Sequence, residues 1–500
     1  MSVLYQKSVQ VAVLSLVLIL AACTSDRGEK DSVDLLISDK VVGKTMIWLG
    51  PSIITKGPSE EITAKYIRDS GFNTTKYWHY TRNYPQLAAR RELYGPRTKE
   101  IAIRQVLEQP EKIDWDFELE IHQDKSANEH RLDLCKKYGI QPVINFLATT
   151  DDPKAAPGKK TLWGQLFWTD PDDQLGRDVF WRRVFLYCYW ANKIKNYNFT
   201  LWEVGCENYP EASAMMAEVG SDAIREAEKL TGVKVKIAAA GEDYSISDIG
   251  VTFEKILLGK AADRLDALSY HSFNFYSKFP EESGFPTYLE HLRYFNFVQR
   301  WCRSDNNLLP YWDTSWAWRT GHRTFGLYQS DHLLAGLQYT SRLIWSNQGG
   351  VELSAPFIMY GPESDSLYGG NLSGFIKVKE GTEETRPSKS YYAMRMIARA
   401  TVGGKQRLEL EGLPAGDKVL ALASRDKENL YLTVINRTKD TAHKFPINKP
   451  AGLSDGRPYF LREFSEKVND EVVGEGKLPL ELELEPLSVK QLIVPLQNGR

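Results

Sequence analysis

Short apolar segments alternate with longer amphipathic segments between residues 44 and 395 of this chain. The amphipathic segments have helical spacing, and several of them, such as "EHRLDLCKKYG", close with the glycine that suits a helix end. This alternation predicts a (β/α)₈ TIM barrel whose last helix lies at residues 385–400. The apolar segments predict eight strands, at residues 44–50, 73–80, 141–148, 199–205, 235–241, 265–273, 309–316 and 351–360.

The pattern changes near residue 400. Segments such as "KVLALAS" and "LYLTVINR" alternate at the period of two that is typical of strands, and no helical stretch separates them. This part predicts a small all-β sandwich. A chain of 500 residues also exceeds one ordinary core. We therefore expect a barrel at residues 44–400 and a sandwich at 401–500.

The N-terminus has the pattern of a targeting segment. Lys7 precedes the apolar run "VAVLSLVLIL", which is too short to span a membrane comfortably and ends in small residues. The stretch "LAAC" at residues 20–23 resembles the bacterial lipobox, which implies cleavage before Cys23 and lipid attachment to that residue. We expect a lipoprotein signal peptide at 1–22, a polar tether at 23–43 and a chain anchored to the cell membrane or outer membrane. The alternative is an ordinary secretion signal whose cysteine stays free.

Composition narrows the possible partners. The formal net charge is −2, whereas nucleic-acid binders usually show a clear basic excess, so we expect no nucleic acid. Contact with a membrane is expected through the lipid anchor only. The other four cysteines form no CxxC, which argues against a disulfide framework, and no spacing supports a metal site. We expect neither a metal nor an organic cofactor.

The stretch "LWEVGCENYP" at residues 201–210 places Glu203 and Glu207 on one face of the fourth predicted strand. Barrel enzymes carry their catalytic groups at the C-terminal ends of the strands. Glu207 follows the strand directly, so it is the candidate for a site. Glu203 lies about 13 Å deeper at strand rise, and we expect it to be paired inside the barrel.

The segment "WEVGCEN" resembles the W-E-x-G-N-E motif of the clan A glycoside hydrolases, whose barrels are often followed by a β-sandwich. "LDALSYHSFNF" and "RPSKSYYAMRMIARA" are similar to the sixth strand and the closing helix of these enzymes, in the same order. The resemblance implies a glycoside hydrolase that cleaves polysaccharide or oligosaccharide, with Glu207 as general acid. Protonation is needed because a glycosidic oxygen is a poor leaving group. The alternative for Glu207 is a surface salt bridge.

The chain departs from the family pattern at two positions. Cys206 replaces an asparagine that donates a hydrogen bond to the sugar 2-hydroxyl, and a thiol is a weak donor. In "YWDTSWAW", Ser315 stands where the family has its nucleophilic glutamate. The nearest acid is Asp313, one strand step deeper.

Asp313 leads to the hypothesis of an inverting mechanism. A retaining glycosidase needs its two carboxyl groups about 5–5.5 Å apart, whereas an inverting enzyme leaves room for water at about 6.5–9.5 Å. Aspartate is shorter than glutamate, and Asp313 lies two residues before position 315, so its carboxyl group would be farther from that of Glu207. In this hypothesis Asp313 activates the water. The alternative is that Asp313 is hydrogen-bonded in the barrel floor. Glu242 and Glu352 are the other candidates for the second acid.

Further residues are expected to contact sugar. His271, near the end of the sixth strand, would position a carboxylate or a sugar hydroxyl, or else it is a buried, satisfied imidazole. Aromatic loop residues stack on sugar rings, and histidine and arginine beside them favour an anionic sugar such as a uronate or sulfate. The full set of predicted substrate contacts is Trp78, His79, Arg82, Cys206, Asn208, His271, Trp316 and Trp318.

A second function class also fits the sequence. A carbohydrate-binding surface lipoprotein could keep the barrel and lose catalysis, and the missing glutamate at position 315 supports that alternative. Fold alone does not separate the two, because barrels host many functions.

Overall fold

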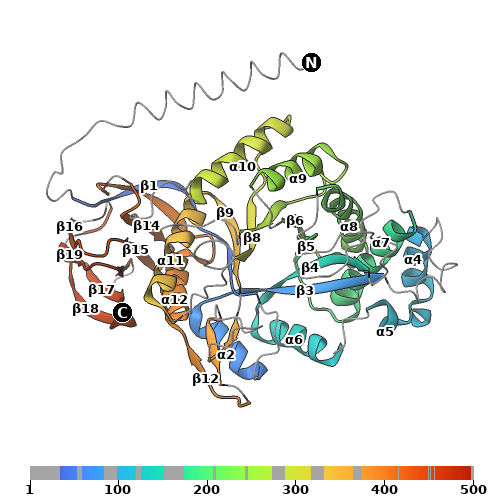
Figure 1. Ribbon diagram of the computed structural model, residues 1–500, viewed down its shortest axis with the longest axis horizontal. Coiled ribbons are helices and arrows are strands. Elements are labelled where there is room, and N and C mark those ends of the chain that lie inside the picture. The colour runs from blue at the N-terminus through green and yellow to red at the C-terminus, as the bar shows by residue number, and fades with distance from the viewer. Residues whose placement is uncertain are drawn as a thin grey trace.

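The computed structural model shows a barrel and a β domain lying against one another (Figure 1). It describes residues 34–496 apart from 53–58, 84–97, 120–124, 151–173, 207–209, 243–245, 273–287, 317–330, 358, 364–373, 380, 415, 449, 451 and 455.

The barrel is one sheet of eight strands, in the order β2-β9-β8-β7-β6-β5-β4-β3, and every neighbouring pair is parallel. Each predicted segment overlaps one of these strands, so the predicted TIM barrel is confirmed. The strands are β2 (Trp48–Leu49), β3 (Thr74–Asn83), β4 (Gln141–Thr150), β5 (Leu201–Val204), β6 (Lys236–Glu242), β7 (Ala267–His271), β8 (Tyr311–Trp316) and β9 (Val351–Pro356).

The barrel closes between its first and second strands through the residues that follow β2. Ser52 forms parallel bridges both to Lys76 on β3 and to Phe357 after β9. A Cβ atom at Gly50 would lie 1.7 Å from the carbonyl oxygen of Thr74. Only glycine therefore lets the two backbones approach closely enough to complete the cylinder.

Helices surround the barrel. The first of them, α2, begins at Ser59, whose hydroxyl accepts from the Ile62 amide at 3.2 Å, and it ends at Gly71 with a φ of 77°. Gly71 is thus the left-handed helix end that the sequence predicted. The helices are α2 (Glu60–Ser70), α4 (Thr98–Glu108), α5 (Trp115–Glu118), α6 (Lys125–Tyr138), α7 (Gln174–Tyr189) with its π-helical extension η2 (Trp190–Ile194), α8 (Pro210–Thr231), α9 (Ile246–Leu258), α10 (Tyr288–Cys302), α11 (Leu333–Gln348) and α12 (Lys389–Thr401), with the short 3-10 turn η1 (Pro110–Lys112) after α4.

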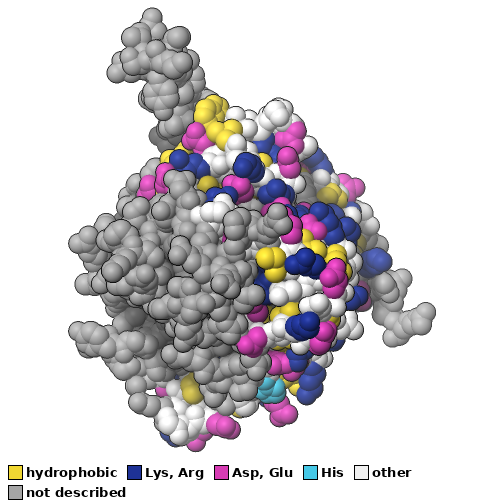
Figure 2. Space-filling model, turned by 90° about the vertical axis from the view of Figure 1, so that its right-hand side faces the viewer, with side chains coloured by type: hydrophobic (Ala, Val, Ile, Leu, Met, Phe, Trp, Pro, Cys, Tyr) yellow, Lys and Arg dark blue, Asp and Glu magenta, His cyan; other side chains and the backbone are white. Residues whose placement is uncertain are grey.

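The surface of the barrel carries charges of both signs. On the face at the right of Figure 1, acidic and basic side chains are interspersed over the described part (Figure 2). This mixture agrees with the nearly balanced composition of 63 Lys and Arg against 65 Asp and Glu. None of the described helices is long and apolar enough to cross a membrane.

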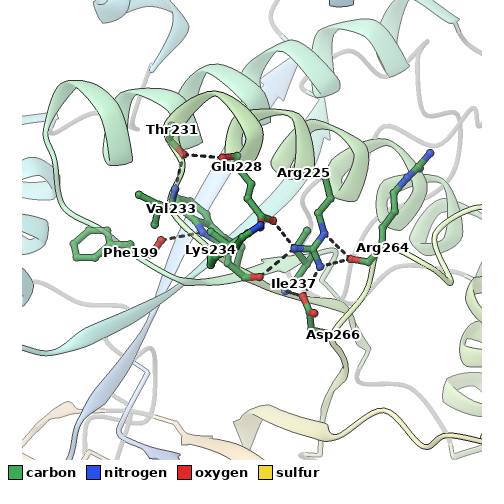
Figure 3. Close-up of polar contacts among 11 residues, drawn as sticks. Phe199, Arg225, Glu228, Thr231, Val233, Lys234, Ile237, Arg264 and Asp266 are labelled. Carbon is green, nitrogen blue, oxygen red and sulfur yellow. Dashed lines mark hydrogen bonds and ion pairs between the residues drawn. The ribbon is translucent and has the colours of Figure 1, made fainter.

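Arg225 on α8 forms hydrogen bonds and an ion pair at the N-terminal ends of β6 and β7 (Figure 3). Its guanidinium donates to the carbonyl oxygens of Val235 at 3.1 Å and Arg264 at 2.8 Å and pairs with Asp266 at 2.6 Å. Asp266 in turn accepts from the amide of Ile237 at 2.8 Å. The cluster joins α8 to the starts of β6 and β7, at the end of the barrel that is opposite the predicted site.

The β domain is a sheet in the order β1-β13-β14-β15-β20-β17-β18, covered by the two-stranded sheet β16-β19. Their inner faces share one hydrophobic cluster, so the predicted sandwich is confirmed. The strands are β1 (Leu36–Lys44), β13 (Gln406–Glu411), β14 (Val419–Arg425), β15 (Asn429–Asn436), β16 (His443–Ile447), β17 (Pro458–Phe464), β18 (Asn469–Lys477), β19 (Leu480–Leu484) and β20 (Ser488–Pro495). A small sheet of β10 (Tyr360–Pro362), β11 (Ile376–Val378) and β12 (Thr385–Pro387) precedes α12.

The other face of the large sheet packs on α11 and α12. Leu420 and Leu422 on β14 belong to the same hydrophobic cluster as the barrel core. A buried carboxylate, Asp470, accepts hydrogen bonds from Arg395 and Arg399 on α12 at 2.5 and 2.7 Å. The barrel and the β domain therefore share one continuous core.

Strand β1 corrects the predicted tether at 23–43. Residues 36–43 are not a linker, because β1 pairs antiparallel with β13 at the edge of the large sheet. Leu35 and Ile37, which are 1% and 5% exposed, enter the sandwich core, and this burial holds the segment in place. Cys23 and the predicted signal peptide lie outside the described residues.

We predict that Gly50→Ala opens the barrel seam. The added methyl group would overlap the Thr74 carbonyl, so the free energy of unfolding should fall by about 3 kcal/mol. Urea unfolding followed by circular dichroism measures the loss. Gly474→Ala is the matched control, since its Cβ would meet nothing closer than 3.8 Å. Equal stability of the two variants would contradict the proposed role of Gly50.

Candidate active site

The inside of the barrel changes from apolar to polar along its axis. One layer is a hydrophobic cluster that includes Leu201 on β5 and Trp312 on β8. Two residues further along the same strands, and thus nearer their C-terminal ends, come Glu203 and Thr314, which face the same interior. The polar layer therefore lies on the side of the barrel where the predicted site begins.

Glu203 is the centre of this polar layer. Its carboxylate pairs with the Lys76 Nζ at 2.7 Å, and both side chains are fully buried. Asn145 Nδ2 donates to the same carboxylate at 2.8 Å, and Thr314 Oγ1 donates to it at 2.5 Å. Lys76 Nζ also lies 2.8 Å from the Nε2 atom of His271. The predicted role of Glu203 as a buried, paired acid is confirmed.

The environment of Glu203 keeps it ionised. Burial raises the pKa of this carboxyl group, but the charges of Lys76 and His271 and the hydrogen bonds from Lys76 and Thr314 outweigh burial. The net result is a pKa below the ordinary value for glutamate. A carboxylate held in this way is a poor proton donor, so Glu203 does not compete with Glu207 for the role of general acid.

His271, the last residue of β7, is 1% exposed and lies beside the Lys76 ammonium group. This placement agrees with the alternative of a buried imidazole held by neighbours. The contact with Lys76 links β7 to β3 across the barrel interior. A direct contact of His271 with sugar stays a prediction.

The strand that leads to Glu207 ends in a close approach. Gly205, with a φ of 98°, leaves no room for a side chain, because its Cβ would lie 2.6 Å from the carbonyl oxygen of Ala240. Cys206 follows and is 4% exposed. Glu207 and Asn208 come next and lie outside the described residues, so their roles stay predictions.

Asp313 does not face the interior that Glu203 and Thr314 share. Its carboxylate accepts from Tyr288 at the start of α10 at 2.9 Å and pairs with Arg342 on α11 at 3.3 Å. Thr314 contacts Glu203 in the interior, and adjacent residues of a strand point to opposite sides, so Asp313 is turned toward the helices. The sequence analysis assumed that the Asp313 side chain points into the barrel, and the structure corrects this assumption. The placement agrees with the structural alternative, and a catalytic role for Asp313 stays a prediction.

Asp313 and Arg342 form a buried pair. Burial raises the pKa of Asp313. The charge of Arg342 and the hydrogen bonds from Ser272 and Tyr288 lower it, but by less, so the pKa lies above the ordinary value for aspartate. The Arg342 guanidinium lies 4.6 Å from the ring centre of Tyr288 and 4.5 Å from that of Trp316. Arg342 is therefore held between two rings, with Asp313 as its counter-ion.

Trp316 belongs to this packing. It is 1% exposed, its Nε1 donates to Ser354 Oγ at 2.8 Å, and its ring packs on Tyr339. A buried ring cannot stack on a sugar, so the predicted substrate contact of Trp316 is not supported. Trp78, His79 and Arg82 lie on β3, but their side chains are outside the described part, as is all of Trp318.

The other two candidates for the second acid lie at opposite ends of the barrel. Glu352 is the second residue of β9 and pairs with Lys236 at 2.8 Å, at the N-terminal ends of the strands. Glu242 is the last residue of β6. Only Glu242 is therefore at the end where barrel sites are built.

Sequence reasoning missed Lys76, Asn145 and Arg342. A lysine inside the apolar segment "NTTKYWHY" was the available signal, because a buried cation needs a partner acid, and Glu203 was already expected in the interior. Nothing in the sequence marked Arg342, which lies in the middle of α11. Among the described residues, no group of three or more His, Cys, Asp or Glu side chains is arranged to hold a metal ion.

The fold is similar to those of solved glycoside hydrolases. A glucosidase from Croceicoccus marinus matches with a TM-score of 0.62 at 12% identity, over 94% of this chain and 100% of that chain. For a GH30 endoxylanase from Clostridium papyrosolvens C71 the TM-score is 0.58 at 11% identity, over 93% and 100%. For a GH51 α-L-arabinofuranosidase from Thermotoga petrophila RKU-1 it is 0.59 at 15% identity, over 92% and 99%.

These matches confirm the predicted fold, a barrel with an appended β domain. At such low identities they concern the fold alone. No known family model matches the sequence, and no curated protein matches it.

We predict strong coupling between Lys76 and Glu203. Lys76→Met leaves a buried carboxylate without its cation and should cost about 3–5 kcal/mol of unfolding free energy. The variant Lys76→Met/Glu203→Leu removes both charges and should lose clearly less than the sum of the single variants. Urea unfolding of the wild type, the two single variants and the double variant completes this double-mutant cycle. Additive losses of unfolding free energy would contradict the pairing.

The pH dependence of Lys76→Met provides a second check. In the wild type the lowered pKa of Glu203 contributes stability above the unfolded pKa of about 4.3, and this stability is lost as pH falls through the folded pKa. Without Lys76, burial dominates and raises the pKa of Glu203. The variant should therefore recover part of its stability, relative to the wild type, as the pH falls from about 7 to about 5.

Proposed function

We propose that this chain is a glycoside hydrolase that cleaves polysaccharide or oligosaccharide at the bacterial cell surface or in the periplasm, with Glu207 as the general acid. One observation carries the proposal. Strand β5, in a fold similar to those of xylanases and arabinofuranosidases, ends at Val204, so Glu207 follows it at the end of the barrel where sites are built.

The polar layer supports this role of Glu207. Lys76 neutralises Glu203, so this buried carboxylate does not attract the catalytic proton. The hydrogen bond from Asn145 Nδ2 to the carbonyl oxygen of Gly205, at 2.7 Å, fixes the backbone two residues before Glu207. Proton donation to the glycosidic oxygen needs an acid that is held in place while the bond breaks.

Glu242 is the better placed partner acid. Val204 pairs with Ala239 in the parallel register of β5 and β6. Glu242 is the last residue of β6, so it lies at the C-terminal end of the strand next to β5, whereas Asp313 is turned toward the helices. We therefore favour Glu242 as nucleophile over Asp313 as base.

The substrate and the location follow the sequence-based expectations. Trp78, His79 and Arg82 lie on β3, which with β4 extends as a paired ribbon beyond the last pairing of β4 with β5. This ribbon forms a side of the barrel mouth, where an anionic sugar would meet the histidine and the arginine. Lipidation at Cys23 would keep the enzyme at the membrane.

A second candidate function is carbohydrate binding without hydrolysis. Ser315 replaces the expected nucleophile, and Asp313 is turned toward α10 and α11. Of the other two candidates for the second acid, Glu352 lies at the N-terminal ends of the strands and Asp313 faces the helices. If Glu242 is not catalytic, none of the three candidates supplies the second acid. The protein would then bind glycans and cleave none.

We predict that Glu207→Gln abolishes hydrolysis. The loss should be about 10²–10⁴-fold in kcat on polysaccharides with poor leaving groups, since general acid catalysis contributes that much. Activity is measured as reducing ends released from a panel of neutral and sulfated or uronate-containing polysaccharides. Glu211→Gln, an exposed residue on α8, is the control and should keep full activity. Hydrolysis that survives in Glu207→Gln would refute the acid assignment, and a wild type that binds but cleaves none of the panel would favour the binding function.

The second acid gives a separate prediction. Glu242→Gln should lose activity by about 10³-fold or more and keep its unfolding free energy, whereas Asp313→Asn should lose about 3 kcal/mol because Arg342 would keep a buried, unpaired charge. NMR of the first product then decides between the mechanisms. Net retention of anomeric configuration agrees with Glu242, and inversion would return the role to Asp313.

A further inference from the structure

Three arginines converge on one buried carboxylate where α12 meets the β domain. Asp470 accepts from Arg395 Nε at 2.5 Å and from Arg399 Nη1 at 2.7 Å, both on α12. On β17, Arg462 Nε donates to the same carboxylate at 2.7 Å. The backbone carbonyl oxygen of Asp470 also accepts from Arg395 and Arg462. We call Arg395, Arg399, Arg462 and Asp470 the arginine cluster.

A β-bulge places the carboxylate of the cluster. In the antiparallel pair of β17 and β18, Glu463 lies opposite Glu471, whereas the next residue, Phe464, lies opposite Asn469. Asp470 is therefore the extra residue of a bulge. Its φ of 56° lies in the left-handed region, which aspartate enters more readily than most residues. The bulge lets Asp470 face α12, where it is buried.

The charges of the arginine cluster do not balance, because three guanidinium groups share a single carboxylate. Among the described residues, no acid other than Asp470 pairs with any of the three arginines. Helix α12 adds Lys389 and contains no acid. Glu463 on β17 alternates to the opposite face of the sheet and lies 3.7 Å from Lys490. Glu475 on β18 lies opposite Phe460, one strand step beyond the cluster. The cluster therefore has an excess of positive charge.

Some guanidinium nitrogens of the cluster are available to a ligand. Arg395 Nη1, Arg399 Nε and Nη2, and Arg462 Nη1 form no hydrogen bond with the described residues. None of these nitrogen atoms is buried. The three side chains are 23%, 29% and 20% exposed, whereas that of Asp470 is shielded from solvent. A ligand can therefore reach the donors without meeting the carboxylate.

Apolar side chains lie beside these donors. Phe460 is two residues before Arg462 on β17, so the two side chains share a face of the sheet, and Phe460 is 38% exposed. Val472, which lies opposite Arg462, is 46% exposed. On α12, the ring centre of Tyr392 lies 5.0 Å from the Arg395 guanidinium carbon. Apolar surface with a few convergent polar groups is typical of sites for organic ligands. This surface suits a charged saccharide better than a bare ion.

We propose that the arginine cluster is a second binding site, which holds sulfate or carboxylate groups of an acidic polysaccharide. Guanidinium groups bind such oxyanions through paired N–H donors, and the bound anion offsets the excess positive charge. Helix α12 and strands β17 and β18 lie at the left of Figure 1, whereas β3 points its C-terminal end to the right. The cluster is thus separate from the barrel mouth, and it binds one part of a polymer while the mouth meets another. The choice of a polysaccharide rests on the proposed function.

Paired oligosaccharides test the proposal by isothermal titration calorimetry. The protein should bind sulfated dextran oligosaccharide or oligogalacturonate more tightly than dextran oligosaccharide or methyl-esterified oligogalacturonate, the uncharged counterparts. Arg399→Gln removes one cation and its available donors, so binding should weaken at least about tenfold. Asp470 keeps two guanidinium partners in this variant, so the fold should persist. Arg300→Gln is the matched control, because it removes the same charge from an exposed side chain on α10, and it should bind as the wild type does.

Chemical modification of the wild type gives a readout that needs no variant. Phenylglyoxal modifies accessible arginines, and peptide mass spectrometry measures the rate at each position. The charged oligosaccharide that binds should slow modification of Arg395, Arg399 and Arg462 and leave Arg300 unaffected.

Three results would overturn the proposal. The first is that neither charged oligosaccharide binds more tightly than its uncharged counterpart, and the second is that Arg399→Gln binds as tightly as Arg300→Gln. The third is protection of the cluster by inorganic sulfate as strong as that by the oligosaccharide, which would assign the cluster to a free anion. None of these readouts requires hydrolysis. A wild type that binds through the cluster and cleaves nothing would contradict the proposed catalysis and leave this inference standing.

Discussion

The ion pair between Lys76 and Glu203 organises the interior of the barrel. Removal of two charges from water costs several kcal/mol per ion, so such a pair adds little net stability, but the loss of one partner is severe. Strands β3, β4, β5 and β8 each contribute one group to it, through Lys76, Asn145, Glu203 and Thr314. All four strands must keep their register for the carboxylate to be satisfied. The pair thus selects one arrangement of the strands below the mouth.

Most of the barrel could be predicted because its strands are buried on both faces. Such strands appear in the sequence as apolar runs between helices, and all eight were found in this way. Strands β1, β11, β12, β16 and β18 were missed. Strand β1 buries only Ile37 among its nine residues, and β18 contains two glycines and several charges. Where little apolar surface is buried, alternation is weak, and the sequence carries no clear signal for a strand.

The candidate site was predictable only in part. The burial of Glu203 follows from its place inside a strand, but its partner comes from a strand far away in the sequence, which no local pattern indicates. The facing of Asp313 was misjudged because strand β8 is irregular. Tyr270 pairs with Asp313, whereas the next residue, His271, pairs with Ser315. This extra residue interrupts the simple alternation on which the prediction relied.

The pairing of β1 with β13 has a consequence for the order of assembly. Strand β1 leaves the ribosome before any part of the barrel. Its hydrogen-bonding partner, β13, is made only after the barrel is complete. During synthesis, β1 is an unpaired edge with exposed apolar residues, and such edges invite contacts with other chains. Contacts this distant in sequence also form slowly, since a long loop must close first. The edge of the large sheet can therefore form only after residues 406–411 have been made.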